Sequence, residues 1–251
     1  MTVQPLGEAW EPERTEDSMQ FVYGTLRDRI LDGDLEPGAV LSQVRLAKQF
    51  GISRTPLREA LRRLVAEHLV TGDFNRRMRV SELNLDDLDQ IYAMRIALEP
   101  VGVAATLPLA DPARRAALAG SVDRMGEAIA SLDLELFRRE HRVFHLGLTV
   151  GGGARLHGLL GDLWDHSERY RLAYLQHDYA ERDSASAERL RTSQAEHRAI
   201  LAAALAGDAD ACSEALVAHL QRTVDVVFRE SMRVPRPRVA TYAVAARSGL
   251  S

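Results

Sequence analysis

The stretch that decides the fold of the first part of the chain reads Phe50-Gly51-Ile52-Ser53-Arg54-Thr55-Pro56-Leu57-Arg58-Glu59-Ala60-Leu61. A helix that starts near Gln43 is expected to end at Gly51. A second helix is expected to begin at Ser53 or Thr55, because both residues are good caps. Pro56 then falls in the first turn, where its missing N–H costs little. Two helices joined by so short a turn are typical of a helix-turn-helix.

The second helix separates an apolar face from a basic one. Leu57, Leu61 and Leu64 recur at the spacing of a buried stripe. Polar side chains therefore gather at the exposed N-terminal end, which a recognition helix inserts into the major groove of DNA. Arginine suits that place because its planar fork can bond guanine O6 and N7 together. The residues expected to contact DNA from these two helices are Arg45, Ser53, Arg54, Thr55 and Arg58.

A small hairpin is expected after the second helix. Leu69-Val70 and Met78-Arg79-Val80 are short apolar runs, and the turn-like Gly72-Asp73-Phe74-Asn75 lies between them. Three arginines would direct this hairpin toward phosphates or a minor groove, namely Arg76, Arg77 and Arg79. The order of helix, turn, helix and hairpin predicts a winged helix-turn-helix. The alternative is a surface helix hairpin whose arginines never touch DNA.

Composition is compatible with this prediction. The 251 residues are 46% hydrophobic and 27% charged, which is ordinary for a soluble protein of one large or two modest domains. The net charge is −4, but residues 18–82 hold eleven Lys or Arg against eight Asp or Glu. That segment therefore carries +3 and the remainder −7. The basic part coincides with the proposed DNA reader.

Targeting signals are not apparent in the sequence. Cys212 is the single cysteine, so an intramolecular disulfide is excluded. The N-terminus lacks a basic segment followed by an apolar one, and no apolar run approaches the roughly 20 residues needed to cross a membrane. A cytoplasmic protein without a membrane partner is expected.

Four segments are predicted along the chain. Residues 1–17 form a mobile N-terminal arm, 18–83 the winged helix-turn-helix, 84–232 an all-helical domain and 233–251 a C-terminal tail. The helical domain has breaks at residues 107–112, 151–153, 177–186 and 207–208. These breaks give about six helices in an antiparallel bundle, so the fold class is mainly α.

Four histidines in the helical domain have informative spacing. His141 and His145 are four residues apart, which places both on one helix face. His197 lies ten residues before Gly207 and His219 eleven after Asp208, so both lie roughly 15 Å from the same turn. If the helix of His141 and His145 packs beside that hairpin, up to four imidazoles converge, and such a site favours Zn²⁺, Ni²⁺ or related transition ions over Mg²⁺ or Ca²⁺. The alternative for each histidine alone is a hydrogen-bonded core or surface residue.

The segment from about Val22 to Leu83 resembles the DNA-binding domain of GntR-type transcription regulators. Shared motifs are Pro37-Gly38, Leu46-Ala47, the stretch quoted above, Leu69-Val70 and an arginine-rich wing. His68 and Arg77 stand where the family has glycine. Because arginine resists the positive φ that glycine allows, the wing is expected to be shaped differently or to be mobile.

The second half resembles the FCD effector domain of the FadR branch of these regulators. Its motifs read Met94-Arg95, Leu98-Glu99, His141-Arg142-Val143-Phe144-His145, Glu196-His197, Gly207-Asp208 and His219-Leu220. In metal-binding members an aspartate and three histidines hold the ion, which carries over to His145, His197 and His219, with His141 replacing the aspartate. The resemblance also directs Arg95 toward a small carboxylate effector. The alternative for Arg95 is an exposed pair with Glu99.

The expected function is that of a ligand-responsive transcription regulator, a homodimer that represses from a pseudo-palindromic double-stranded DNA operator. The alternative from another class is a metal-dependent hydrolase-type enzyme that uses the histidine cluster. Against it, the sequence from His141 to His145 lacks the glutamate that serves as general base in His-Glu-x-x-His proteases. No catalytic residue is therefore assigned. The effector, the operator and the identity of the metal stay open.

Overall fold

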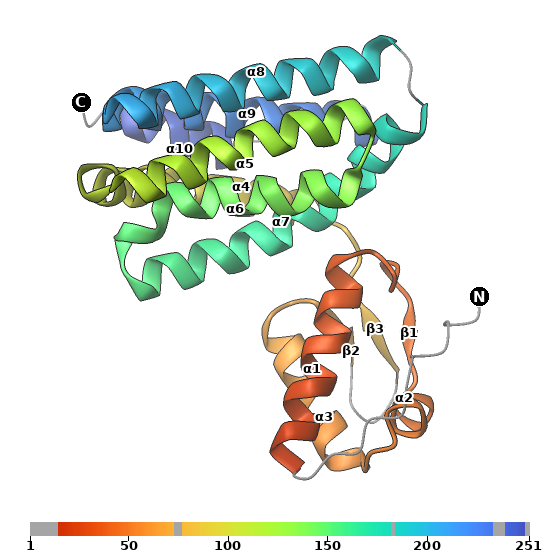
Figure 1. Ribbon diagram of the computed structural model, residues 1–251. Coiled ribbons are helices and arrows are strands. Elements are labelled where there is room, and N and C mark those ends of the chain that lie inside the picture. The colour runs from red at the N-terminus through yellow and green to blue at the C-terminus, as the bar shows by residue number, and fades with distance from the viewer. Residues whose placement is uncertain (1–14, 73–76, 182–183, 233–238, 249–251) are drawn as a thin grey trace. The chain divides into compact units, whose positions relative to one another are not determined.

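The computed structural model describes residues 15–72, 77–181, 184–232 and 239–248 (Figure 1). The chain divides into two compact units, residues 1–83 and 84–251. The described residues form ten α-helices, two short 3-10 helices and three strands, which confirms the mainly α fold class. Among these helices, none combines the length and the apolar character that a membrane span requires.

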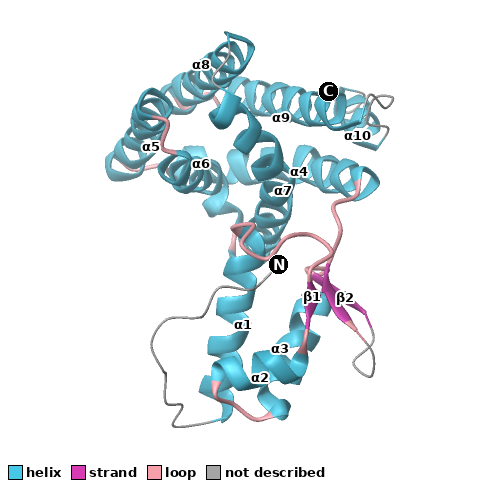
Figure 2. Cartoon of the chain, turned by 90° about the vertical axis from the view of Figure 1, so that its right-hand side faces the viewer, coloured by secondary structure: helices cyan, strands magenta, loops and turns pink. Residues whose placement is uncertain are grey.

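The N-terminal unit contains all three strands of the described residues (Figure 2). Its elements in chain order are α1 (Thr15–Leu31), β1 (Val40–Leu41), α2 (Gln43–Phe50), α3 (Arg54–Ala66), β2 (Val70–Gly72) and β3 (Met78–Val80). The strands form an antiparallel sheet in the order β1-β3-β2, with Val40 opposite Arg79 and Val70 opposite Val80. This is the predicted winged helix-turn-helix, preceded by an additional helix, α1.

Local signals explain the helix boundaries of α2 and α3. The side chain of Ser42 accepts a hydrogen bond from the backbone N–H of Arg45 at the start of α2, and Gly51 ends that helix with φ 65°. Ser53 takes the N-cap position of α3. The predicted leucine stripe of α3 is fully buried in the core of the unit.

The wing takes its tight backbone conformation at a glycine. Gly72 has φ 126°, and a Cβ built there would lie 2.3 Å from the backbone oxygen of Arg77. Arg77 is not among the described residues with positive φ. The arginine at the usual glycine place therefore adopts no left-handed conformation, and Gly72 makes the close approach to its carbonyl oxygen. Residues 73–76, and with them Arg76, lie outside the described residues.

The end of α3 contains a second departure from the usual glycine pattern. His68 has φ 58°, and its backbone N–H bonds the carbonyl of Val65 at 3.0 Å. The N–H of Leu69 bonds the carbonyl of Leu64 at 3.0 Å. These two bonds make a Schellman motif, in which glycine is the usual left-handed residue. A histidine therefore occupies a position that strains its backbone.

The second unit is helical throughout its described residues. Its elements are α4 (Leu85–Thr106), η1 (Leu107–Leu109), α5 (Pro112–Ser131), α6 (Leu134–Thr149), η2 (Val150–Gly152), α7 (Ala154–Glu181), α8 (Ser184–Ala206), α9 (Ala209–Met232) and α10 (Val239–Ser248). Figure 1 shows α5, α6, α8 and α9 as long neighbouring helices, and α4 packs against α6, α7 and α9. Helices α4 to α9 match the expected number of about six, but the boundary between α5 and α6 at residues 132–133 was not among the four breaks expected from the sequence.

The turn between α8 and α9 has clear local causes. Gly207 adopts φ 74°, and the N–H groups of Gly207 and Asp208 bond the carbonyls of Ala204 and Ala203. The side chain of Asp208 then caps α9 by accepting a bond of 2.9 Å from the N–H of Ala211. A tight turn of this kind sets the two helices antiparallel.

The C-terminal segment differs from the tail expected at residues 233–251, because residues 239–248 form α10. This helix packs on α4. The buried carboxylate of Asp89 accepts bonds from the N–H groups of Val239 and Ala240 at 2.8 and 2.9 Å. These are free donors at the helix N-terminus, so Asp89 caps α10 from another helix. At the other end of the chain, residues 15–17 of the expected arm belong to α1, and residues 1–14 lie outside the described residues.

The first residues of the second unit are held by α7. The backbone N–H of Asn84 donates to the hydroxyl oxygen of Tyr170 at 3.2 Å, and that hydroxyl donates to Asp87 at 2.9 Å. Burial raises the pKa of Tyr170 above its ordinary value, so the hydroxyl keeps its proton. The start of α4 is thereby fixed to the middle of α7.

Candidate functional site

The N-terminal end of α3 presents the side chains expected to read DNA. Ser53, Arg54, Thr55 and Arg58 are exposed, as is Arg45 on α2. The hydroxyl of Ser53 makes no capping hydrogen bond to its own helix. Arg79 is exposed on β3, where it donates to the carbonyl oxygen of Gly38 at 2.8 Å. Arg77 is exposed beside the wing, and Arg76 belongs to the segment that the structure does not describe.

The second unit brings the four predicted histidines together. His141 and His145 come from α6, His197 from α8 and His219 from α9, and all four are buried. One ligand nitrogen from each lies within 4.8 Å of the other three. The Nε2 atoms of His145 and His197 are 3.4 Å apart. Because Zn–N bonds are about 2.0–2.1 Å, two nitrogens of a tetrahedral zinc site lie about 3.3–3.4 Å apart.

The antiparallel turn at Gly207 explains why two of these histidines meet. The rings of His197 and His219 are nearly equidistant from the turn along the chain, and their centroids lie 4.5 Å apart. The ring of His141 is 4.6 Å from that of His145 one turn away on α6 and 4.7 Å from that of His197. The spacing in the sequence thus corresponds to proximity in space.

The four imidazoles are neutral in this surrounding. Burial lowers the pKa of His141, His145 and His197 well below 6.5, and nearby cationic side chains act in the same direction. Burial likewise lowers the pKa of His219 to about 3. Neutral imidazole is the form that donates a lone pair to a transition metal, so the cluster has the chemistry of a ligand set.

Carboxylates lie behind two of the rings. The Oε2 atom of Glu196 is 2.6 Å from Nδ1 of His219, and the Oε2 atom of Glu99 is 3.7 Å from Nδ1 of His145. A carboxylate that accepts a hydrogen bond from Nδ1–H leaves Nε2 with its lone pair directed away from the carboxylate. His219 is therefore oriented as a metal ligand is in a carboxylate–histidine–metal arrangement.

Arg95 is paired with Glu99 but is not exposed. Its Nε donates to Glu99 at 2.6 Å and its Nη1 to Ser167 at 2.9 Å, while the guanidinium carbon lies 4.6 Å from the ring centre of Trp164. The side chain is 1% exposed, and its Nη2 has no hydrogen-bond partner. The pair with Glu99 therefore exists, but the alternative that it is exposed is wrong, because the face of α4 that carries Arg95 packs against α7. The Nη2 atom of Arg95 is therefore a buried donor without an acceptor.

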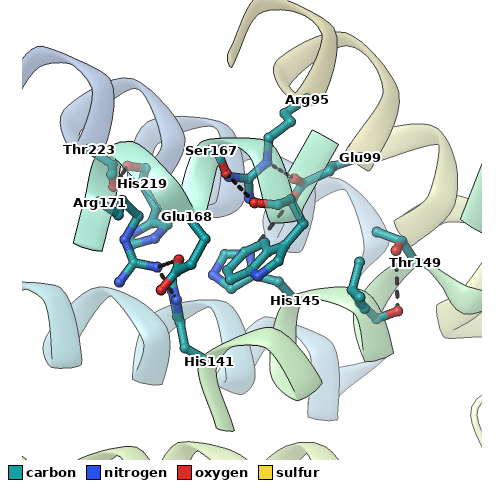
Figure 3. Close-up of polar contacts among 12 residues, drawn as sticks. Arg95, Glu99, His141, His145, Thr149, Ser167, Glu168, Arg171, His219 and Thr223 are labelled. Carbon is teal, nitrogen blue, oxygen red and sulfur yellow. Dashed lines mark hydrogen bonds and ion pairs between the residues drawn. The ribbon is translucent and has the colours of Figure 1, made fainter. Parts of the chain in front are cut away.

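A second buried arginine contacts the cluster. Arg171 on α7 donates through Nη1 to Glu168 at 2.8 Å, and the same nitrogen contacts Nδ1 of His141. Figure 3 shows Arg171 beside His141 and Glu168, whereas Arg95 bridges Ser167 and Glu99. Two guanidinium groups from different helices thus lie near the four imidazoles.

Sequence reasoning did not identify the contribution of α7. Ser167, Glu168 and Arg171 are buried at the site, although the pattern around them is that of an ordinary charged helix. The spacing of Glu168 and Arg171 was available as a signal, because residues three apart share a helix face. Burial of that face depends on α4 and α6, and no local pattern reports it.

A winged helix-turn-helix joined to a helical unit with a buried ligand-type cluster defines a ligand-responsive, DNA-binding transcription regulator, and not an enzyme. The chain belongs to the gntR family of bacterial regulatory proteins and carries the FCD domain. Residues 19–80 match the gntR family and residues 90–222 the FCD domain. The resemblance seen in the sequence is thereby confirmed.

Known relatives are also regulators. The chain is 31% identical to an uncharacterized HTH-type transcriptional regulator of Streptomyces ambofaciens, over 83% of this chain and 84% of that protein. It is 28% identical to the HTH-type transcriptional repressor GlaR of Escherichia coli, over 82% and 93% of the two chains. The solved structure of E. coli McbR/YncC aligns with a TM-score of 0.72 at 26% identity, covering 86% of this chain and 99% of that one. The hydrolase alternative receives no support from these relatives.

Proposed function

We propose that this protein is a cytoplasmic homodimeric repressor that responds to a small carboxylate bound at a transition metal, Zn²⁺ or Ni²⁺. Two copies of α3 would enter successive major grooves of a pseudo-palindromic operator through Arg45, Ser53, Arg54, Thr55 and Arg58, with Arg76, Arg77 and Arg79 of the wing on the backbone or minor groove. The observation that carries this proposal is the cluster of four buried imidazoles in the unit joined to the DNA reader.

The metal part of the proposal rests on the donor set. His145, His197 and His219 each offer a ring nitrogen, and His141 contributes a fourth imidazole to the cluster. The Nε2 atoms of His145 and His197 face each other at 3.4 Å, and the carboxylate of Glu196 at Nδ1 of His219 leaves Nε2 of that ring to the cluster. Imidazole donors suit Zn²⁺ and Ni²⁺.

The effector part rests on Arg95. Its Nη2 is buried without a hydrogen-bond partner. Arg95 lies on α4, the helix that also carries Glu99. A carboxylate bound to the metal would satisfy that donor with a charge-assisted hydrogen bond. Such an acid acts as a switch only if it binds the DNA-competent and the released conformations with different affinity. We infer that it favours release, as the repressor GlaR among the relatives suggests.

The first test is native mass spectrometry of untagged protein purified without chelators. We expect a dimer with one transition metal per chain, because each chain supplies a complete imidazole cluster. A metal-free dimer would mean that the four histidines have structural roles, and it would contradict the proposal that the second unit senses an acid through a metal. The DNA-binding half would be unaffected by that outcome.

The second test asks whether acid binding in the second unit changes DNA binding by the first unit. Operator affinity is measured by fluorescence anisotropy while carboxylic acids are added to metal-loaded protein. We expect at least one acid to weaken binding about tenfold or more. The variant His145→Ala should bind the operator normally but lose the response, since His145 is buried in the cluster and not on the DNA-reading face. An acid response that survives in His145→Ala would show that the effector binds elsewhere.

A further inference from the structure

The contact between Arg171 and His141 restricts what His141 can do. A guanidinium group has only donors, so Nδ1 of His141 must be the acceptor in this contact. A neutral imidazole that accepts at Nδ1 carries its proton on Nε2. One nitrogen is then engaged by Arg171 and the other is protonated. Neither has a free lone pair for a metal ion.

The surroundings hold both side chains in this arrangement. The ring of Phe137 stacks on that of His141, with centroids 5.4 Å apart and planes 18° apart, and the guanidinium carbon of Arg171 lies 5.8 Å from the Phe137 ring centre. Glu168 accepts a bond of 2.8 Å from Nη1 of Arg171. All four side chains are buried. Freeing a lone pair on His141 would therefore require Arg171 to leave a buried ion pair.

His219 has the opposite environment. A carboxylate, Glu196, accepts at its Nδ1 and so directs the Nε2 lone pair into the cluster. His145 and His197 face each other through Nε2 at 3.4 Å, a distance suited to two ligands of one ion. Of the four rings, only His141 has a cation at a ring nitrogen.

We propose that His141 is not a metal ligand but the partner that positions Arg171, so that the ion is held by His145, His197 and His219 alone. This inference rests on the proposed function. Three neutral imidazoles leave the charge of a divalent ion uncompensated and at least one coordination position free. The guanidinium of Arg171, held next to the cluster, adds to the positive field. The site therefore selects anionic ligands and needs the anion to complete its coordination.

The ligand number is measured directly with ¹¹³Cd²⁺ as the probe metal and ¹⁵N-labelled protein. Scalar coupling between cadmium and ring nitrogens is expected for three imidazoles, while His141 keeps the spectrum of a ring protonated on Nε2 with and without cadmium. Four coupled imidazoles, His141 among them, would overturn the inference. A protein that binds no cadmium, zinc or nickel would overturn the proposed function itself, so the two failures are distinguishable.

A matched pair of variants tests the same point by affinity. His141→Ala and His145→Ala remove equally buried rings one turn apart on α6. Zinc affinity, measured by competition with a chromophoric chelator, should fall by less than about threefold in His141→Ala. It should fall by about 100-fold or more in His145→Ala, because loss of a ligand exceeds the 10- to 100-fold cost of a supporting residue. Equal losses in two folded variants would contradict the inference.

A third variant is expected to gain a metal ligand. Arg171→Leu removes the only donor that engages Nδ1 of His141 among the described contacts of that nitrogen. The freed ring should then join the ion, and the number of cadmium-coupled imidazoles should rise from three to four. A structural disturbance would reduce this number or leave it unchanged. A count that stays at three in folded Arg171→Leu would overturn the positioning role assigned to His141.

Discussion

His68 shows how one residue can retain backbone strain within a common type of helix end. It occupies the left-handed position of the Schellman motif that ends α3, with φ 58°. For a residue other than glycine, this conformation costs about 1–2 kcal/mol. The side chain is exposed, so it gains little from burial in return. The strain is a local property that can be removed without touching the core.

We therefore expect His68→Gly to stabilise the N-terminal unit by about 1 kcal/mol, because glycine adopts positive φ without strain and only part of the gain is lost to its more flexible unfolded state. Urea unfolding monitored by circular dichroism measures the change. His68→Ala serves as the control and should give no such gain, since alanine keeps the Cβ. An unchanged midpoint for His68→Gly would show that the histidine makes a compensating contact.

The histidines of the buried cluster could be foreseen residue by residue, whereas Arg171 could not. His145, His197 and His219 were placed by spacing along α6 and about one turn of the chain at Gly207. The role of Arg171 depends on which face of α7 is covered by α4 and α6. A charged residue on an exposed face and one on a buried face look alike in the sequence.

At the scale of the element, the arginines of α3 differ in their surroundings. Arg58 is exposed near the N-terminal end, and Arg62 pairs with Glu59 at 2.8 Å on the same helix. We expect Arg58→Ala to cost about 1 to 3 kcal/mol on the operator with little loss on random DNA, because a bidentate contact to guanine is specific. Arg62→Ala is the matched control and should change operator affinity less. Equal losses on both DNAs would mean that Arg58 contacts phosphate.

Helix α10 could not be foreseen from the sequence, for a physical reason. The prolines before it suggested an irregular tail, and ten residues are too few to form a stable helix alone. Its existence depends on packing against α4 and on the cap that Asp89 supplies from more than a hundred residues away in the chain. By contrast, α2, α3 and the hairpin carry their own capping and turn residues, and these elements were predicted correctly.

The cap on α10 leads to a prediction. Asp89→Ala removes both acceptors from the first two N–H groups of α10, so we expect the docking of α10 to weaken by about 1–2 kcal/mol. Hydrogen exchange of residues 239–248 should speed up roughly tenfold. The neighbouring exposed residue Gln90 offers a control, because Gln90→Ala leaves the cap intact. Unchanged exchange in Asp89→Ala would show that packing alone holds α10.

At the scale of the whole molecule, the two units have separate cores, and only one of them contains the histidine cluster. Metal should therefore stabilise the units unequally. At a thousandfold excess over its dissociation constant, a bound ligand adds about 4 kcal/mol. We expect removal of metal with a chelator to lower the melting temperature of the second unit by about 10 °C and to leave the first unchanged. Calorimetry with the chelator, and again after zinc is restored, measures this difference.

The hydrogen bond from Asn84 to Tyr170 has a consequence for communication along the chain. Tyr170 is the residue before Arg171, and Asn84 is the first residue of the second unit. If a ligand in the cluster moves Arg171, it acts one residue away from the bond that holds the first residue of the second unit. Because linkage is reciprocal, the proposed switch has a second face: if the anion alters the affinity for DNA, DNA held by the first unit alters the affinity for the anion by the same factor. In that sense, the operator would itself be an effector of the proposed acid site.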